Sequence, residues 1–250
     1  MGVALCCEQE TEGVNAVGIG EGYRPDYESA PHVIVHGVAG AGTAEDRDGM
    51  SARFGREDTR RGELFEGFAG NAIWRWLASR PDEVHLFHDL RGFGTVEGGG
   101  FGPMSIGRAN IDHLVLTGDQ WLMIDSKGTA AGVLCCEPGE KARGMLVRPD
   151  GSCVAQPWMD SLNGYSAGAL LFRLLPGLTG FPVWLVSAQT NTDHPSLCRS
   201  RCISKAGRII NLVELAADDL ECVFPSGRPS ADPGLVAVLD RYVSAPVSAV

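Results

Sequence analysis

The chain has 250 residues, of which 44% are hydrophobic and 21% charged, a balance that is ordinary for a globular protein. Its formal net charge of −10 argues against a broad basic surface for non-specific nucleic-acid binding, although a local basic groove stays compatible with it. No apolar run in the sequence reaches the roughly 18 residues that a membrane span needs, so we expect no membrane span.

Residues 1–55 are rich in glycine and have little periodicity, so we expect a poorly ordered N-terminal segment. The exception is HVIVHGVAGAGT at 32–43, which is similar to the phosphate loop of helicase-type ATPases because an apolar run precedes glycines. A phosphate loop needs a lysine before its Ser or Thr, but here Gly42 directly precedes Thr43. The pattern therefore predicts a short strand and a turn.

Residues 57–79 have the 3.6-residue period of an amphipathic helix, which Pro81 closes. A rotation of about 100° per residue places Glu66 on the flank of the apolar stripe, while Glu63 points further toward solvent. The stripe consists of Phe65, Phe68, Ala69, Ala72, Ile73, Trp76 and Leu77.

A strand is expected at 83–90, followed by a glycine-rich loop. The segments IDHLVL (111–116) and WLMIDSK (121–127) then predict a β-hairpin, with TGDQ as its turn. Side chains alternate along a strand, so Asp125 and Lys127 share one face. In a suitable register the hairpin brings Asp112 to the same place. The alternative is a simple ion pair between Asp125 and Lys127 at a strand end.

The downstream sequence predicts further strands and helices, with a turn near RPDGS. The resulting order of helix, three strands, helix, two strands and helix predicts an α/β domain with a mixed sheet. The expected elements are a helix at 158–178, a strand at 181–188, a strand within 202–215, and short helices at 218–222 and 232–243.

Eight cysteines are present, including two adjacent pairs, and this arrangement does not form a disulfide framework in a chain of this length. His194, Cys198 and Cys202 are spaced along one helix face, but a zinc site needs a fourth ligand and the sequence offers none nearby. We therefore expect reduced thiols and a cytoplasmic location.

The segments FHDLRGFG and ANIDHLVLTGDQWLMIDSKG resemble the nuclease-related domain family, NERD, of the PD-(D/E)xK nuclease superfamily. The likeness is strong over residues 58–128 and weaker to about 222. It implies a restriction-endonuclease-like fold, a mixed β-sheet flanked by helices. The implied organisation is an N-terminal segment at 1–55, a nuclease domain at 56–225, and a C-terminal helix and tail at 226–250.

The same resemblance implies a metal-dependent reaction on phosphodiester bonds, with Mg²⁺ or Mn²⁺ as cofactor. Asp112 and Asp125 would be metal ligands, joined by the Ser126 carbonyl and by Glu66 directly or through water. Lys127 would orient the attacking water or stabilise the transition state. Each of these residues also has a structural alternative, such as a solvated helix position for Glu66.

Two functional classes follow from these observations. The first is a nuclease acting on nucleic acid, DNA more than RNA, with a helicase or other DNA-processing protein as a partner. The second is a catalytically inactive nuclease-like module that binds nucleic acid or a partner protein. The intact set of Asp112, Asp125 and Lys127 favours the first class, whereas the acidic composition favours the second. His113 lies on the opposite strand face and is expected to make structural hydrogen bonds.

Overall fold

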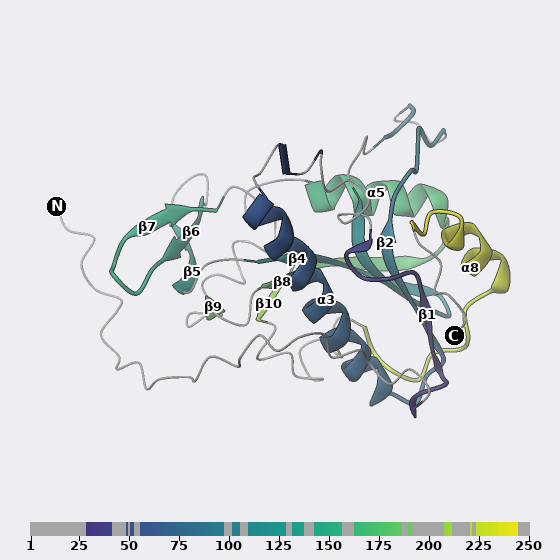
Figure 1. Cartoon of the computed structure of the whole chain (residues 1–250). Helices are drawn as coiled ribbons and strands as arrows, with labels where there is room; N and C mark the ends of the chain where they lie inside the picture. Colours follow the sequence, from purple (N-terminus) through teal and green to yellow (C-terminus); the bar gives the residue numbers. More distant parts are fainter. Residues whose placement is uncertain are drawn as a thin grey trace.

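The computed structural model of the chain describes residues 29–41, 49, 51–52, 56–97, 102–105, 110–128, 132–137, 143–156, 163–186, 190–191, 208–211, 221 and 224–244. Within these ranges the fold is a mixed α/β arrangement with a six-stranded sheet and a separate four-stranded sheet (Figure 1). The α/β prediction is thus confirmed. Among the described residues, no helix combines the length and apolar character needed to cross a membrane.

The large sheet has the strand order β1-β2-β3-β4-β8-β10. Its centre is antiparallel, because β3 pairs in opposite directions with β2 and with β4, while β1, β8 and β10 add parallel pairs at the two edges. The strands are β1 (Val33–His36), β2 (Val84–Leu90), β3 (Ile111–Thr117), β4 (Gln120–Lys127), β8 (Thr179–Val186) and β10 (Arg208–Asn211). The predicted hairpin is confirmed, as are the strands expected at 83–90, at 181–188 and within 202–215.

Helices cover both faces of this sheet, as the alternation along β4 makes clear. Leu122 and Ile124 pack with α3 (Arg56–Ala78), while Trp121 and Met123 pack with α5 (Asn163–Leu174) and α8 (Pro233–Asp240). Such two-sided burial explains why the strand is apolar at consecutive positions. The helix predicted at 57–79 is confirmed as α3, and α5 and α8 lie within the helices expected at 158–178 and 232–243.

The N-terminal strand β1 contributes an edge to the sheet. It pairs in parallel with β2, Val33 lying opposite Val84, and the turn that follows contains Gly37 and Gly40 at positive φ. The short strand and turn predicted at 32–43 are therefore present. Since β1 lies within the segment 1–55 that we expected to be poorly ordered, the sheet begins before the predicted domain boundary at residue 56.

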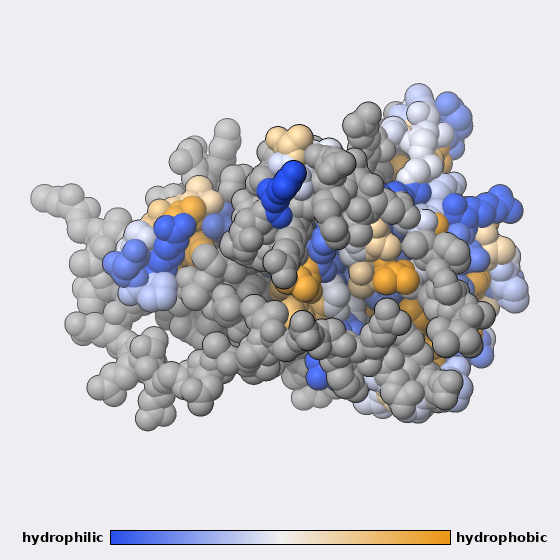
Figure 2. Space-filling model, viewed as in Figure 1, coloured by the Kyte–Doolittle hydropathy of each residue, from blue (hydrophilic) through white to orange (hydrophobic). Residues whose placement is uncertain are grey.

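The second sheet, of order β7-β6-β5-β9, lies beside the first (Figure 1). The turn predicted near RPDGS joins β6 to β7, with the Arg148 N–H donating to the Ser152 carbonyl at 2.9 Å. The short strands of this second sheet show no clear alternation of apolar and polar residues in the sequence. Figure 2 shows hydrophilic residues at the outer end of the sheet. The strands are β5 (Gly132–Glu137), β6 (Arg143–Val147), β7 (Cys153–Ala155) and β9 (Thr190–Asn191).

Some predictions fall on residues that the structure does not describe. His194, Cys198 and Cys202 lie outside the described ranges, as does the helix expected at 218–222 except for Glu221. No structural statement follows for them.

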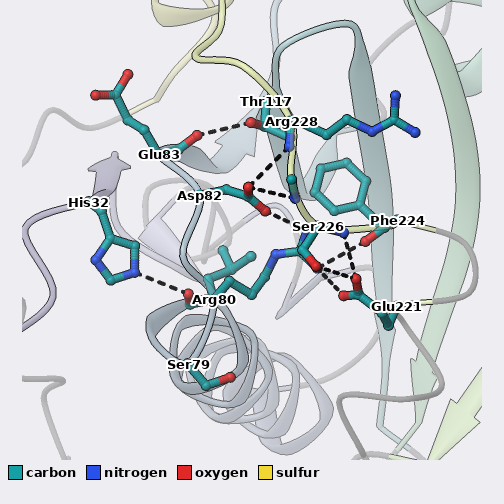
Figure 3. A network of polar contacts seen from close by, with 12 residues as sticks. His32, Ser79, Arg80, Asp82, Glu83, Thr117, Glu221, Phe224, Ser226 and Arg228 are labelled. Carbon is teal, nitrogen blue, oxygen red and sulfur yellow. Dashed lines mark hydrogen bonds and ion pairs between the residues drawn. The ribbon is translucent and has the colours of Figure 1, made fainter.

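A buried polar network connects the end of α3 to the segment that precedes α8 (Figure 3). Arg80 donates to Asp82 at 2.9 Å, to Glu221 at 2.7 Å and to the Phe224 carbonyl at 2.9 Å. Asp82 in turn accepts backbone N–H bonds from Gly227 at 2.8 Å and Arg228 at 3.1 Å. The side chains of Arg80 and Asp82 are each 4% exposed, so each charge depends on its partner.

Replacing Asp82 with alanine tests this network. Asp82→Ala leaves the buried Arg80 guanidinium without its buried carboxylate partner and leaves two backbone N–H groups without an acceptor. We expect the free energy of unfolding in urea to fall by about 3–5 kcal/mol. Asp119→Ala is the matched control, because its contact with Arg228 is exposed. A loss no larger than that of the control would contradict the structural role of Asp82.

Candidate active site

The register of β3 on β4 brings the predicted acidic residues together. His113 lies opposite Ile124, so continuing the antiparallel register by one residue places Asp112 opposite Asp125. Asp112 is 8% exposed, and its Oδ2 accepts the backbone N–H of Ser126 at 2.7 Å. The hairpin therefore sets one aspartate on each strand at the same end of the sheet, as the sequence predicted.

Lys127 completes this group from the end of β4. Its ammonium donates to Asp125 Oδ1, and the two side chains are 31% and 23% exposed. Burial opposes the charged form of Lys127, but the neighbouring carboxylates of Asp125, Asp112 and Glu66 outweigh it and raise its pKa above the ordinary value. Lys127 is thus a firmly protonated cation at neutral pH.

Asp112 shows the opposite balance. Burial raises its pKa well above the ordinary value, and the carboxylates of Asp125 and Glu66 raise it further, while Lys127 opposes the rise. A charged Asp112 consequently costs free energy in this position. Lys127 lowers this cost only in part.

Glu66 reaches the group from α3. The turn after β1 lies against this part of the helix: a Cβ placed at Gly40 would be 3.5 Å from Glu66 Oε2 and 3.1 Å from the Glu63 carbonyl oxygen. Glu66 is half-buried and lies close enough to shift the pKa of both Asp112 and Lys127. Asp112, Asp125 and Lys127 thus lie together at the end of the hairpin, and Glu66 acts on Asp112 and Lys127 electrostatically from α3.

Ser126 turns its side chain to the opposite face of the sheet. Its Oγ lies 2.9 Å from His113 Nε2, and His113 Nδ1 lies 2.8 Å from His88 Nδ1. The two histidine rings are buried beneath α3, where Gly70 leaves room for His88. The structural hydrogen bonding predicted for His113 is confirmed. His88 was not predicted, because a histidine in an apolar strand carries no signal of its partner.

A second contact missed by the sequence analysis joins β2 to the site. Asn110 Nδ2 donates to Asp89 Oδ1 at 3.1 Å and to Asp112 Oδ1 at 3.2 Å. Asp89 also accepts from the Arg91 guanidinium at 2.9 Å. In the sequence, Asp89 is only one polar residue in the strand segment expected at 83–90. Its link to Asp112 depends on the pairing of β2 with β3.

The donor set suits a hard divalent cation in its chemistry, because it consists of carboxylate and carbonyl oxygens. The two aspartate carboxylates already make hydrogen bonds within the protein. Asp112 accepts from Asn110 and Ser126, and Asp125 pairs with Lys127. Within the described part of the chain, no group of three or more His, Cys, Asp or Glu side chains has the geometry of an assembled metal centre. Metal binding would therefore require Asp125 to turn away from Lys127.

Comparison of the chain with family models, with curated proteins and with solved structures gives no match.

The buried histidines predict an acid-sensitive fold. Burial lowers the pKa of His88 from 6.5 to about 4, and it also lowers the pKa of His113. Between pH 6.5 and about pH 4, His88 binds a proton in the unfolded chain but stays neutral in the folded chain. The stabilising contribution is complete above pH 6.5 and is lost as the pH falls toward 4, on the order of 3 kcal/mol for His88 alone.

Urea unfolding of the wild type and of His88→Gln between pH 7 and pH 4 measures this effect. Asp112 acts in the opposite direction in the same range, so only the difference between the two proteins isolates His88. We expect a flatter pH dependence for His88→Gln. Parallel curves would show that His88 does not keep its neutral form.

Replacing Asp112 with asparagine tests the electrostatic cost of the site. The amide side chain of Asp112→Asn keeps an oxygen for the Ser126 N–H but removes the charge that Asp125 and Glu66 repel. Because the pKa of Asp112 is raised above 3.8, wild-type stability from this group is greatest at acidic pH and declines as pH rises. We expect thermal melts in EDTA to show Asp112→Asn as more stable than the wild type at pH 7. The gain should shrink at pH 5, and lower stability at pH 7 would refute the assigned repulsion.

Proposed function

We propose that the chain is a metal-dependent nuclease of the NERD and PD-(D/E)xK kind, which hydrolyses phosphodiester bonds in DNA more than in RNA. The observation that carries this proposal is the convergence of Asp112, Asp125 and Lys127 at one end of β3 and β4, with Glu66 added from α3. A restriction-endonuclease-like fold is part of the proposal. The antiparallel β2-β3-β4 unit, with β8 parallel to β4, supports it.

The residues that would hold Mg²⁺ or Mn²⁺ are Asp112, Asp125 and Glu66, together with the Ser126 carbonyl. When bound, the ion would supply Lewis-acid activation of the phosphate and of the attacking water. Asp125 would exchange its bond to Lys127 for the ion, which frees the ammonium to face the substrate.

Lys127 has a role that follows from its charge. A lysine whose pKa is raised keeps its proton at neutral pH, so its Nζ acts as a hydrogen-bond donor and a positive charge. It would donate to the scissile phosphate or to the attacking water and stabilise the charge that develops in the transition state. It would not serve as the general base in this form.

A catalytically inactive module that binds nucleic acid or a protein is the second candidate. The Asp125–Lys127 ion pair favours it, since the two groups that catalysis would use neutralise each other. The net charge of −10 favours a protein partner over a phosphate backbone. In either case a helicase or another DNA-processing protein is a partner that we propose for the chain.

Cleavage assays separate the two candidates. The purified chain is incubated with plasmid DNA, linear DNA and RNA in Mg²⁺, in Mn²⁺ and in EDTA. We expect metal-dependent cleavage, with DNA as the preferred substrate. If no nucleic acid is cut with either metal, the nuclease proposal fails, and retention of labelled DNA by the intact chain would then favour the binding module.

Two substitutions at the end of β4 test the assigned roles. Lys127→Ala should reduce cleavage by about 100-fold or more, on the order expected for loss of a transition-state contact, while Mn²⁺ still raises the melting temperature. Asp125→Ala should lose both effects, because a carboxylate binds the ion and an ammonium does not. Full cleavage by Lys127→Ala would contradict the mechanism, and melting curves of both variants control for folding.

A further inference from the structure

Three aspartates lie in one row at the same end of the neighbouring strands β2, β3 and β4. His88 pairs with His113 and Leu90 with Ile111, so the register places Asp89 of β2 beside Asp112 of β3. The register of β3 on β4 then places Asp125 beyond Asp112. The row extends the candidate site by one strand, to a residue that plays no part in the proposed reaction.

Asp89 has a backbone conformation that only a strong local constraint maintains. Its φ is +52°, and it is the one non-glycine residue with positive φ among the residues that the structure describes. Aspartate enters this region more readily than most residues, but the conformation is still unfavourable relative to glycine. The residue is also 1% exposed, so its carboxylate needs partners inside the protein.

The C-terminal residues hold this conformation in place. Ser244 Oγ donates to the Asp89 carbonyl at 2.9 Å, and the Arg91 N–H donates to the Tyr242 carbonyl at 2.8 Å. Leu90 forms an isolated bridge with Val243. The tail after α8 thus pairs with the end of β2 and fixes the direction in which Asp89 points.

The side chain of Asp89 is linked to Asp112 through one amide. Asp89 Oδ1 accepts from Arg91 Nη2 at 2.9 Å and from Asn110 Nδ2 at 3.1 Å, while the same Nδ2 donates to Asp112 Oδ1 at 3.2 Å. Ionised carboxylates only accept hydrogen bonds, so the NH₂ group of Asn110 must face both of them. Arg91 offsets the repulsion that a third carboxylate would otherwise add.

From this geometry we infer that Asp89, acting through Asn110, is a positioning residue that orients the Asp112 carboxylate for cation binding. The inference rests on the proposed function, in which Asp112 is a metal ligand. Asn110 and the Ser126 N–H hold one oxygen each of Asp112, and Asp89 holds Asn110. Outer partners of this kind typically change metal affinity by about 10- to 100-fold when they are removed.

The test compares metal affinity with stability in four variants of the full chain. Asp89→Gly removes the carboxylate and accommodates the positive φ, and Arg91, whose side chain is 30% exposed, can then reach water. Asn110→Ala removes the link itself, and a double variant combines the two. Asp82→Asn is the matched control, because Asp82 is likewise a buried aspartate paired with an arginine two residues away, in the network of Figure 3.

Titration calorimetry with Mn²⁺ and melting curves in EDTA give the two readouts. We expect Asp89→Gly and Asn110→Ala each to raise the Mn²⁺ Kd on the order of tenfold, with melting temperatures lowered no more than in Asp82→Asn. The double variant should bind no more weakly than Asn110→Ala alone, since both changes break one linkage. Asp82→Asn should lower the melting temperature and leave the Kd unchanged.

The outcomes separate this inference from the proposed function. Wild-type Mn²⁺ affinity in folded Asp89→Gly and Asn110→Ala would overturn the positioning role while the nuclease proposal stands. Fully additive losses in the double variant would overturn it as well. If the wild type takes up no Mn²⁺, the proposed metal site fails and the inference fails with it. If Asp89→Gly does not fold, Asn110→Ala alone decides, by the same comparison of Kd with melting temperature.

Discussion

The antiparallel register of β3 on β4 is the constraint on which the candidate site depends. It sets Asp112 opposite Asp125, and the strand period then places Lys127 beside them. A slip of one residue would turn every side chain of β4 to the other face. Burial prevents this slip, because Leu122 and Ile124 pack with α3 while Trp121 and Met123 pack with α5.

The site is a local source of instability that the rest of the fold offsets. Asp112 is buried beside other carboxylates, and its raised pKa expresses the free energy that its charge costs. The hydrophobic core on both faces of the sheet and the Arg80–Asp82 ion pair before β2 supply stability that does not depend on this group. Strongly shifted pKa values of this kind cluster at functional sites, which is why this group is the candidate site.

Segments outside the predicted nuclease domain support the site from both ends of the chain. The turn after β1 lies against Glu66 at Gly40, and the tail after α8 holds Asp89 through Ser244. These contacts bring residues of the segments 1–55 and 226–250 to the α3 and β2 elements. Described residues on both sides of the range 56–225 thus pack against the elements that carry the candidate site.

The sequence by itself determined the α/β class, the helix α3, the hairpin, and the shared face of Asp125 and Lys127. These features follow from local periodicity and from strand alternation, which act over a few residues. The strand register then decided that Asp112 lies opposite Asp125. Only the tertiary structure decided the partners of Asp89, His88 and β1, which come from residues far away in the chain. A buried aspartate or histidine looks the same in the sequence whichever strand lies beside it, and the pairing that supplies its hydrogen bonds exists only once the sheet has formed.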